Sequence, residues 1–559
     1  MTEMVVTIAV IAILAGMMIP FFSATMNRST ADADDAYQKL NEANADITHH
    51  TLSPDMEPTV AIPTGTTAPN KDESGADGGE IPSPTNPGGG ADGGSIPSST
   101  NPTSTKDAVT MTNCDNSTRN FDSFTEALES DHLKSSGSGA TITSYKYTIL
   151  ELNQDIKDDI IIPQTNKDRT SKTAVKIYLN GHTVTGRVIS DGIVNIYGGS
   201  KDKPREKMGT IDARDSTSAF ECTSMGGVGQ IEKVRFIGKN YGVNLYDGII
   251  MNSNPELTEE QKAGFFDCIC EARYDLEGSA GIYSAEDFRR IENTVCTGYY
   301  GFKTSASLTY VYNNTFIGYK TGYYKSGGSQ GGTFKGNICI GETGSGISNY
   351  GSWNADIHGS DKRPSIIIGE EYGIESSSAR LDCSFGQDNS KDENLFIKGS
   401  YPAVAARDGI KDIYSGIFVS CQEGHATVNS YAIDSISGGV FVTGANTNAM
   451  YITSFSRSIT GGTFINTNTN NSPLGMGSNS SGSVSGAKFY SNYNKFPSLG
   501  NATASWNPTS LTADPKSFSY TEYTVGNFEK SDGYYDVDYS YIPTKKTTTI
   551  TTNYYYEAK

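Results

Sequence analysis

IYSGIF at residues 413–418 is followed by three similar segments, ISGGVF at 436–441, ITGGTF at 459–464 and VSGAKF at 484–489. Their phenylalanines recur every 23 to 25 residues, a step typical of solenoids, in which each repeat packs on the next. In each segment, apolar residues that would point inward alternate with other residues, and glycine stands where the chain turns. The pattern predicts a parallel β-helix with four aromatic core positions: Phe418, Phe441, Phe464 and Phe489.

Looser copies of the repeat occur earlier, with IENTVC at residues 291–296 and VYNNTF at 311–316. Further upstream the chain reads TILELNQDIKDDIIIP, VKIYLNGHTVTG and IVNIYGG. These segments resemble the opening coils of right-handed β-helix proteins similar to pectate lyases, and LNGHTVTG at 179–186 carries most of the resemblance. It implies a right-handed parallel β-helix over residues 109–509.

A tyrosine-rich cap or tail is expected over residues 510–559, where 514–538 resembles the terminal coil that often covers such a stack. Two other β architectures fit less well. A propeller needs about 40 residues per blade, and sandwiches lack the glycine-punctuated period. We also expect residues 257–273 to form a short helical excursion from the stack.

The N-terminus, MTEMVVTIAVIAILAGMMIPFFSATMNR, carries no charged side chain over residues 4–27. At ~1.5 Å per residue, a helix of this length would cross a hydrocarbon core of ~30 Å. Glu3 precedes the apolar run and Pro20 lies seventeen residues later. Because a carboxylate in a membrane helix is costly, it usually has a partner or a function.

This stretch resembles the N-terminal helix of type IV pilins and prepilin-like proteins, in which a glutamate near the processed N-terminus is followed seventeen residues later by a kinking proline. The resemblance implies that Glu3 acts in assembly, that Pro20 kinks the helix, and that the helix enters the inner membrane before it packs into an extracellular filament. Glu3 follows two residues rather than the family's four, so Met1 is expected to stand at the third mature position. The alternatives are a plain membrane anchor and a signal peptide, although the latter needs a basic n-region.

The pilin-type helix is expected to cover residues 1–53, because an apolar stripe continues through Tyr37 and Leu40 until Pro54. Residues 54–108 are rich in Pro, Gly, Ser and Thr. They contain a duplicated segment, GADGGEIPSPTNP at 75–87 and GADGGSIPSSTNP at 90–102. Such sequence cannot bury enough apolar surface to offset its ordering entropy. We predict a disordered linker.

The charge balance excludes one class of partner. Only 44 basic residues stand against 63 acidic ones, which gives a net charge of −19. Nucleic-acid binding relies on Lys and Arg to neutralise phosphates, so we expect no nucleic-acid partner. The 60 glycines and 33 tyrosines are instead typical of an exported β-rich protein with many tight turns.

Candidate metal and catalytic residues are few. Cys268 and Cys270 form a single CxC pair, whereas tetrahedral zinc sites usually need two pairs, so buried core thiols are the preferred interpretation and no metal or cofactor is expected. Polysaccharide lyases and hydrolases need clustered carboxylates beside a base. The best such group, Asp287 with Arg289 and Arg290, is interpreted as an exposed ion pair. His182 is interpreted as structural, and no catalytic residue is predicted.

The leading functional prediction is a structural subunit of an extracellular type IV pilus-like filament that displays the β-helix for surface interaction or adhesion. The main alternative is a surface-anchored β-helix enzyme acting on polysaccharides, and a third is an anchored adhesin that never polymerises. Tyrosines, with Trp353 and Trp506, could present flat faces to sugar rings. The expected ligand is therefore a carbohydrate or a host surface.

Overall fold

The computed structural model describes residues 107–559 except 139–141, 167–170, 247–248, 251–262, 378–379, 389–390, 423–424, 445 and 456. The predicted pilin-type helix and nearly all of the predicted linker lie outside these residues, and so do Glu3 and Pro20. Within the described ranges, no helix is long and apolar enough to cross a membrane. The predictions for residues 1–53 therefore stay predictions.

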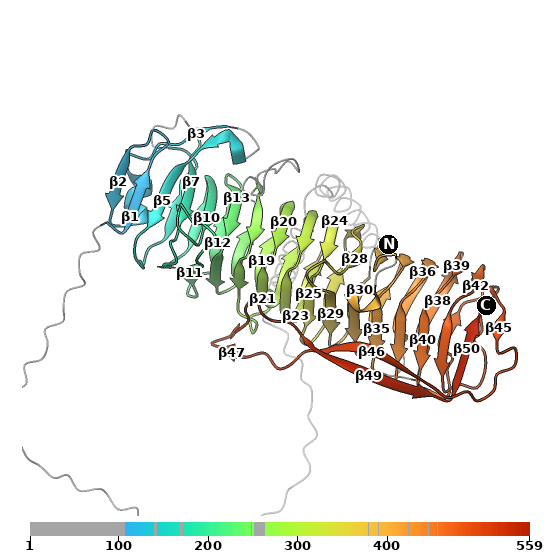
Figure 1. Cartoon of the computed structure of the whole chain (residues 1–559). Helices are drawn as coiled ribbons and strands as arrows, with labels where there is room; N and C mark the ends of the chain where they lie inside the picture. The colour runs from blue at the N-terminus through green and yellow to red at the C-terminus, as the bar shows by residue number, and fades with distance from the viewer. Residues whose placement is uncertain are drawn as a thin grey trace, which may run out of the picture. The chain divides into compact units, whose positions relative to one another are not determined.

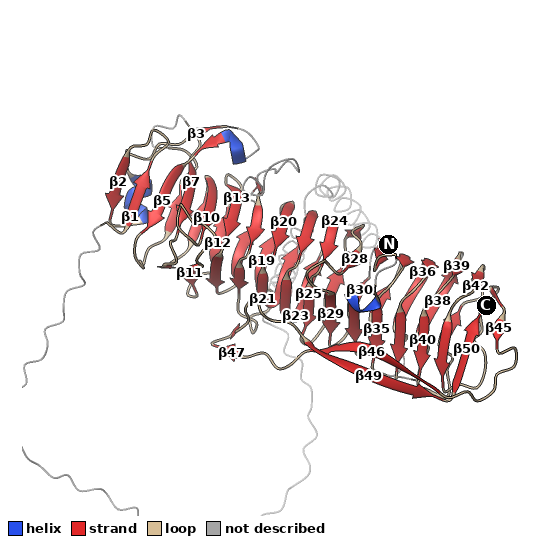
Figure 2. Ribbon diagram, in the orientation of Figure 1, coloured by secondary structure: helices blue, strands red, loops and turns tan. Residues whose placement is uncertain are grey.

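The described chain is a parallel β-helix, so this part of the fold prediction is confirmed (Figure 1). About 14 turns stack between residues 148 and 504. Almost every regular element is a strand, and the only α-helix among the described residues is α3 (Phe124–Glu129) (Figure 2). Most strands pair in parallel with a strand one turn further along the chain. The mostly parallel pairing places successive turns side by side.

A turn has three strand segments, two of which join into one long strand in some turns, and equivalent segments form three columns. One turn consists of β29 (Ser365–Gly369), β30 (Ile374–Ser376) and β31 (Leu381–Phe385). These pair with β32 (Leu395–Gly399), β33 (Val404–Ala406) and β34 (Ile410–Ile413) of the next turn. We call the columns that contain β29, β30 and β31 columns I, II and III.

The phenylalanines of the repeat at residues 413–489 lie in column I. Their strands are β35 (Ile417–Ser420), β37 (Val440–Thr443), β40 (Thr463–Asn466) and β43 (Lys488–Ser491), and they pair in register. Four inward rings are fully buried and stack along the axis, with centroids 4.9 to 5.2 Å apart. They belong to Phe418, Phe441, Phe464 and Phe489.

The glycines of the repeat allow the turn before each column I strand. Gly439 and Gly462 have φ of +95° and +99°, a region that L side chains rarely adopt. A Cβ atom on Gly439 would also lie 3.1 Å from the Phe441 ring. Glycine is therefore needed both for the backbone and for the close approach of the ring.

Both ends of the stack are closed by antiparallel strands. At the first end, β1 (Val109–Thr112) pairs with β2 (Thr118–Phe121) and β5 (Thr148–Leu152). At the last, β50 (Tyr554–Ala558) pairs with β43 and with β45 (Trp506–Asn507). Closure of this kind protects backbone groups that would otherwise recruit another chain.

The tyrosine-rich stretch follows a different path from the expected terminal coil. Residues 514–552, which we call the strap, run back along column I (Figure 1). The strap contains the hairpin of β46 (Lys516–Thr524) and β49 (Thr544–Thr552) and the small hairpin of β47 (Lys530–Ser531) and β48 (Tyr534–Tyr535).

The strap covers a stripe of outward aliphatic side chains on column I. Tyr520, Tyr523 and Tyr535 pack there in a second apolar cluster, separate from the interior. Ion pairs secure the strap, with Lys530 Nζ 2.7 Å from a Glu342 carboxylate oxygen and Lys398 Nζ 2.9 Å from Glu522. Column I is thus apolar on both faces, as is usual for covered parallel strands.

The expected helical excursion over residues 257–273 is wrong for its described part, and residues 257–262 lie outside the described residues. From residue 263 onward the chain contributes β17 (Gly264–Phe266) and β18 (Ile269–Glu271) to the stack. Phe265 and Cys270 are fully buried. The sequence around them reads GFFDCICEA, which is a strand–turn–strand pattern with inward Phe and Cys.

Candidate functional site

The outward face of column II carries a row of side chains that are polar or aromatic at every position but one. Its strands run from β15 (Tyr241–Leu245) to β38 (Met450–Phe455). Because side chains alternate along a strand, the residue between two inward positions points outward on every turn. The register aligns nine such residues: Asn244, Tyr283, Lys303, Tyr324, Ser348, Glu375, Ala405, Asn429 and Tyr451.

Tyrosine rings gather around Lys303 at the first part of this row. The lysine Nζ lies 5.4 to 5.9 Å from the ring centroids of Tyr283, Tyr300 and Tyr324. Tyr324 also contacts Tyr350, with centroids 5.8 Å apart. Such an arrangement brings aromatic rings and a cationic group together on this face.

A shallow groove lies further along the same column, over β30, β33, β36 (Val428–Ile436) and β38. Its volume is about 390 Å³. Glu375, Ala405 and Asn429 belong to the outward row and line it, and Tyr372 and Tyr431 add aromatic walls. Tyr431 is 56% exposed, which is unusual for so large a ring.

The groove offers several hydrogen-bonding groups. A Glu375 carboxylate oxygen accepts weakly from the hydroxyls of Ser345 and Ser348, each at 3.4 Å. Burial, followed by the charges of Glu375 and Glu371, raises the pKa of Tyr372. Its hydroxyl therefore stays protonated and can donate. Arg407 adds an exposed guanidinium to the lining.

The sequence-predicted charged group is used within the scaffold. On β20 (Phe288–Glu292), the Arg290 guanidinium lies 2.5 Å from a Glu292 oxygen and 4.3 Å from the Tyr310 ring centroid. Asp287 accepts from the backbone N–H of Ser307 at 3.0 Å. The structure therefore gives Arg290 a local structural partner.

The candidate histidine and cysteines have local partners as well. His182 Nδ1 lies 3.3 Å from a carboxylate oxygen of Asp155. Cys268 and Cys270 are buried, and burial raises the pKa of both thiols. Over the described ranges, no group of three or more His, Cys, Asp or Glu side chains is arranged to hold a metal ion.

Neither tryptophan lies in the column II row. Trp353 is fully buried in the interior, and its Nε1–H donates to the Ala355 carbonyl at 2.8 Å. Trp506 stacks on Phe496 near the last turn, with centroids 4.9 Å apart. The expectation that Trp353 offers a face to a sugar is therefore wrong.

The sequence reasoning missed the groove. Its strands read IES, VAA and VNS at residues 374–376, 404–406 and 428–430. In each, a middle residue lies between two buried ones. This pattern is a signal for the outward row, but it is too short to be recognised before the turns are aligned.

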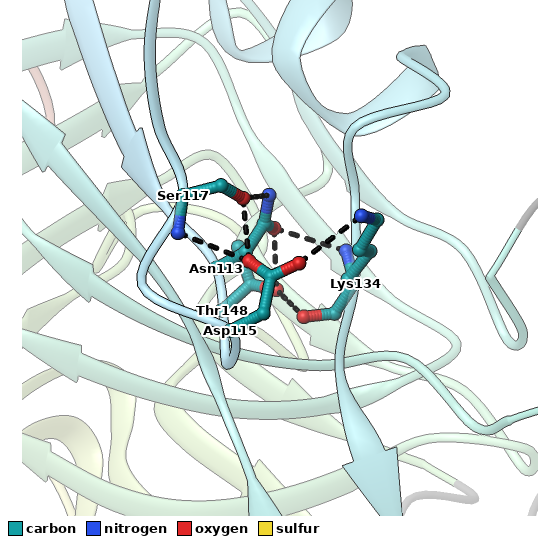
Figure 3. Close-up of polar contacts among 5 residues, drawn as sticks. All are labelled: Asn113, Asp115, Ser117, Lys134 and Thr148. Carbon is teal, nitrogen blue, oxygen red and sulfur yellow. Dashed lines mark hydrogen bonds and ion pairs between the residues drawn. The ribbon is translucent and has the colours of Figure 1, made fainter.

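A polar cluster at the first end of the stack is a second candidate (Figure 3). Asp115 accepts from the Ser117 backbone N–H at 3.0 Å and pairs with Lys134 Nζ at 3.1 Å. These contacts, with Ser117 the strongest, lower the pKa of Asp115. Asn113 accepts from the Lys134 N–H and from the Thr148 hydroxyl. The groups satisfy one another, so this cluster fastens the end of the β-helix.

The column II row and its groove are therefore the better candidate for a binding site. Comparisons of the chain with protein-family models, curated proteins and solved structures find no match.

Proposed function

We propose that this protein is a subunit of an extracellular type IV pilus-like filament that displays its β-helix to bind a carbohydrate surface. In this proposal, residues 1–53 form the filament-core helix and residues 54–108 act as a flexible linker. The displayed domain is a right-handed, pectate-lyase-like β-helix. The column II row and its groove, with the exposed rings of Tyr431 and Tyr451, are the observation that carries the binding role.

The chemistry of this row suits a sugar chain. Aromatic rings give large contact areas to the apolar faces of pyranose rings, while carboxylate, amide and guanidinium groups hydrogen-bond to hydroxyls. Neighbouring turns lie roughly 4.8 Å apart, which is comparable with the length of one sugar ring in an extended chain. A polysaccharide along the axis would thus meet an equivalent position on each turn.

The filament role rests on the N-terminal sequence. A carboxylate at Glu3 gains at most about 1 kcal/mol from a helix dipole, which is too little to offset burial in an apolar bundle. A cation on the neighbouring subunit, such as its N-terminal amine, would complete the pair. This pairing would also fix the axial register between subunits.

Electron microscopy of sheared surface material, labelled with antibody against the β-helix, tests the proposal. We expect labelled fibres that bind immobilised polysaccharides. Labelled membrane without fibres would favour the anchored adhesin. Turnover of polygalacturonate by fibre-free material would favour the enzyme, and either result would overturn the filament role.

A further inference from the structure

The groove over β30 to β38 has a floor that follows the axis. Glu375, Ala405 and Asn429 occupy the same outward position on three successive turns, and Tyr451 occupies it on the fourth. Ala405 is much smaller than its neighbours in the row, so the floor dips at this turn. The hollow therefore results from one small residue within a row of larger ones.

The groove is longer than a single sugar ring. It spans four turns, and adjacent parallel strands lie about 4.8 Å apart, so the floor runs for roughly 14 Å. Its lining comes from both ends of the column II segments. Tyr372 lies just before β30, and Arg407 lies just after β33. Tyr431 lies just after the inward Ser430. The lining therefore extends over four turns along the axis.

The aromatic wall at Tyr372 is held in place before any ligand binds. Its ring stacks on Tyr401 of the next turn, with centroids 5.7 Å apart and planes 29° apart. A ring fixed in this way loses little conformational entropy on binding. Tyr372 and Tyr431 thus supply flat surfaces from two sides of the floor.

The charges in the groove balance. Glu375 is the carboxylate of the lining and Arg407 the guanidinium, and the whole chain carries a net charge of −19. A polyanion such as a uronate polymer would meet the Glu375 carboxylate at short range and a negative protein at long range. Glu375 and Arg407 can both hydrogen-bond to neutral hydroxyl groups.

We propose that this groove binds about three consecutive rings of a neutral polysaccharide that lies parallel to the β-helix axis. The inference rests on the proposed carbohydrate-binding function and specifies its ligand class. Tyr372 and Tyr431 contact the ring faces, while Glu375, Arg407 and Asn429 hydrogen-bond to the hydroxyls.

Titration calorimetry of the full chain with neutral xylo- and manno-oligosaccharides, and with oligogalacturonates of the same lengths, tests this ligand class. We expect the affinity for at least one neutral series to rise up to the tri- or tetrasaccharide and then level off. Added salt should change it less than two-fold. Tighter, salt-sensitive binding of oligogalacturonate would overturn the inference and leave the carbohydrate-binding function standing. Absence of binding by every probe, with fibre binding to polysaccharides retained, would overturn the inference alone.

Substitutions in the groove test whether the oligosaccharide binds there. Ala405→Phe fills the floor without removing a contact group, and Tyr431→Ala removes one wall. Each should weaken trisaccharide binding about ten-fold or more. Tyr246→Ala is the matched control, because Tyr246 is a 40% exposed tyrosine outside the groove, and it should change the affinity less than two-fold. Unchanged affinity in a folded Ala405→Phe variant would overturn the assignment.

Discussion

The rings of Phe441 and Phe464 stack inside the β-helix with their centroids 4.9 Å apart and their planes 18° apart. The separation matches the distance between neighbouring parallel strands, so one turn brings each ring over the next. Tyr556 continues the stack beyond Phe489, at 5.1 Å, from the antiparallel strand that closes the end. The aromatic ladder therefore joins the repeats to the closing strand.

We predict that Phe441→Ala lowers the free energy of unfolding by about 3–5 kcal/mol, because the neighbouring rings cannot fill the cavity. Denaturant unfolding measures the change. Tyr451→Ala is the control, since this outward tyrosine is 41% exposed, and it should have little effect. A neutral Phe441→Ala would contradict the stacked core.

The strap should protect the column I stripe from solvent. Replacing residues 516–552 by a short Gly/Ser connection retains β50, because Lys516 and Thr552 face each other in the hairpin. The uncovered stripe includes Ile340, Ile366 and Phe396. We expect increased binding of a hydrophobic dye and self-association in light scattering. A monodisperse protein without dye binding would contradict the covering role.

Lys325 should make stability depend on pH. Its side chain is buried, Nζ donates to the Ala306 carbonyl at 2.8 Å, and burial lowers its pKa from 10.5 to about 7. Between these values the unfolded chain binds more protons, so this group's contribution makes stability rise with pH. Below pH 7 its full destabilising effect is present.

Lys325→Met should stabilise the protein at pH 7 by an amount on the order of a few kcal/mol. The substitution should also remove the lysine's contribution to the increase in the free energy of unfolding between pH 7 and 10. The measurement is denaturant unfolding of both proteins across this range. Parallel pH profiles would show that Lys325 does not titrate abnormally.

The first end of the β-helix fixes where the chain can be shortened. Val109 and Met111 are fully buried, and β1 pairs with two strands. A protein that starts at Lys106 should melt within a few degrees of one that starts at Pro54. Starting at Asn113 removes β1 and should lower the melting temperature clearly. Equal melting temperatures for all three proteins would show that β1 does not contribute to the stability of the β-helix.

Glu3→Gln should leave the protein in the membrane with its β-helix folded, yet sharply reduce its incorporation into filaments. The reason is the loss of the proposed pairing with the neighbouring amine. Fractionation and labelled microscopy measure the two effects separately. Normal incorporation would return the segment to the status of a simple anchor.

Sequence reasoning succeeded where the information is local. The inward phenylalanines and the glycines at 439 and 462 reveal the turns. Each repeat carries the same order of side chains and the same requirement for a positive φ before the strand. The strap could not be found in this way. Strands such as IFVS at 417–420 show that both faces are apolar, but they do not say which distant segment covers the outer one.

The groove was hidden for a related reason. Glu375, Ala405 and Asn429 lie about thirty and twenty-four residues apart, and only the unequal lengths of the intervening turns bring them into one row. The prediction for Trp353 was wrong because an aromatic residue in a polar stretch of sequence suggests an exposed side chain. In the structure, the interior at that turn is wide enough to enclose it.

The strap also changes how the stack should come apart. In a simple solenoid each turn contacts only its neighbours, and unfolding can begin at an end and spread turn by turn. Here the Tyr534 hydroxyl donates to the Gly238 carbonyl, a residue of β14 (Val234–Gly238), while β50 in the same tail pairs with β43. Turns that are distant along the axis are thereby coupled, so fraying from the last turn must also release contacts in the first third of the stack. We expect a single steep transition with a large m-value and uniformly slow hydrogen exchange from β14 to β43.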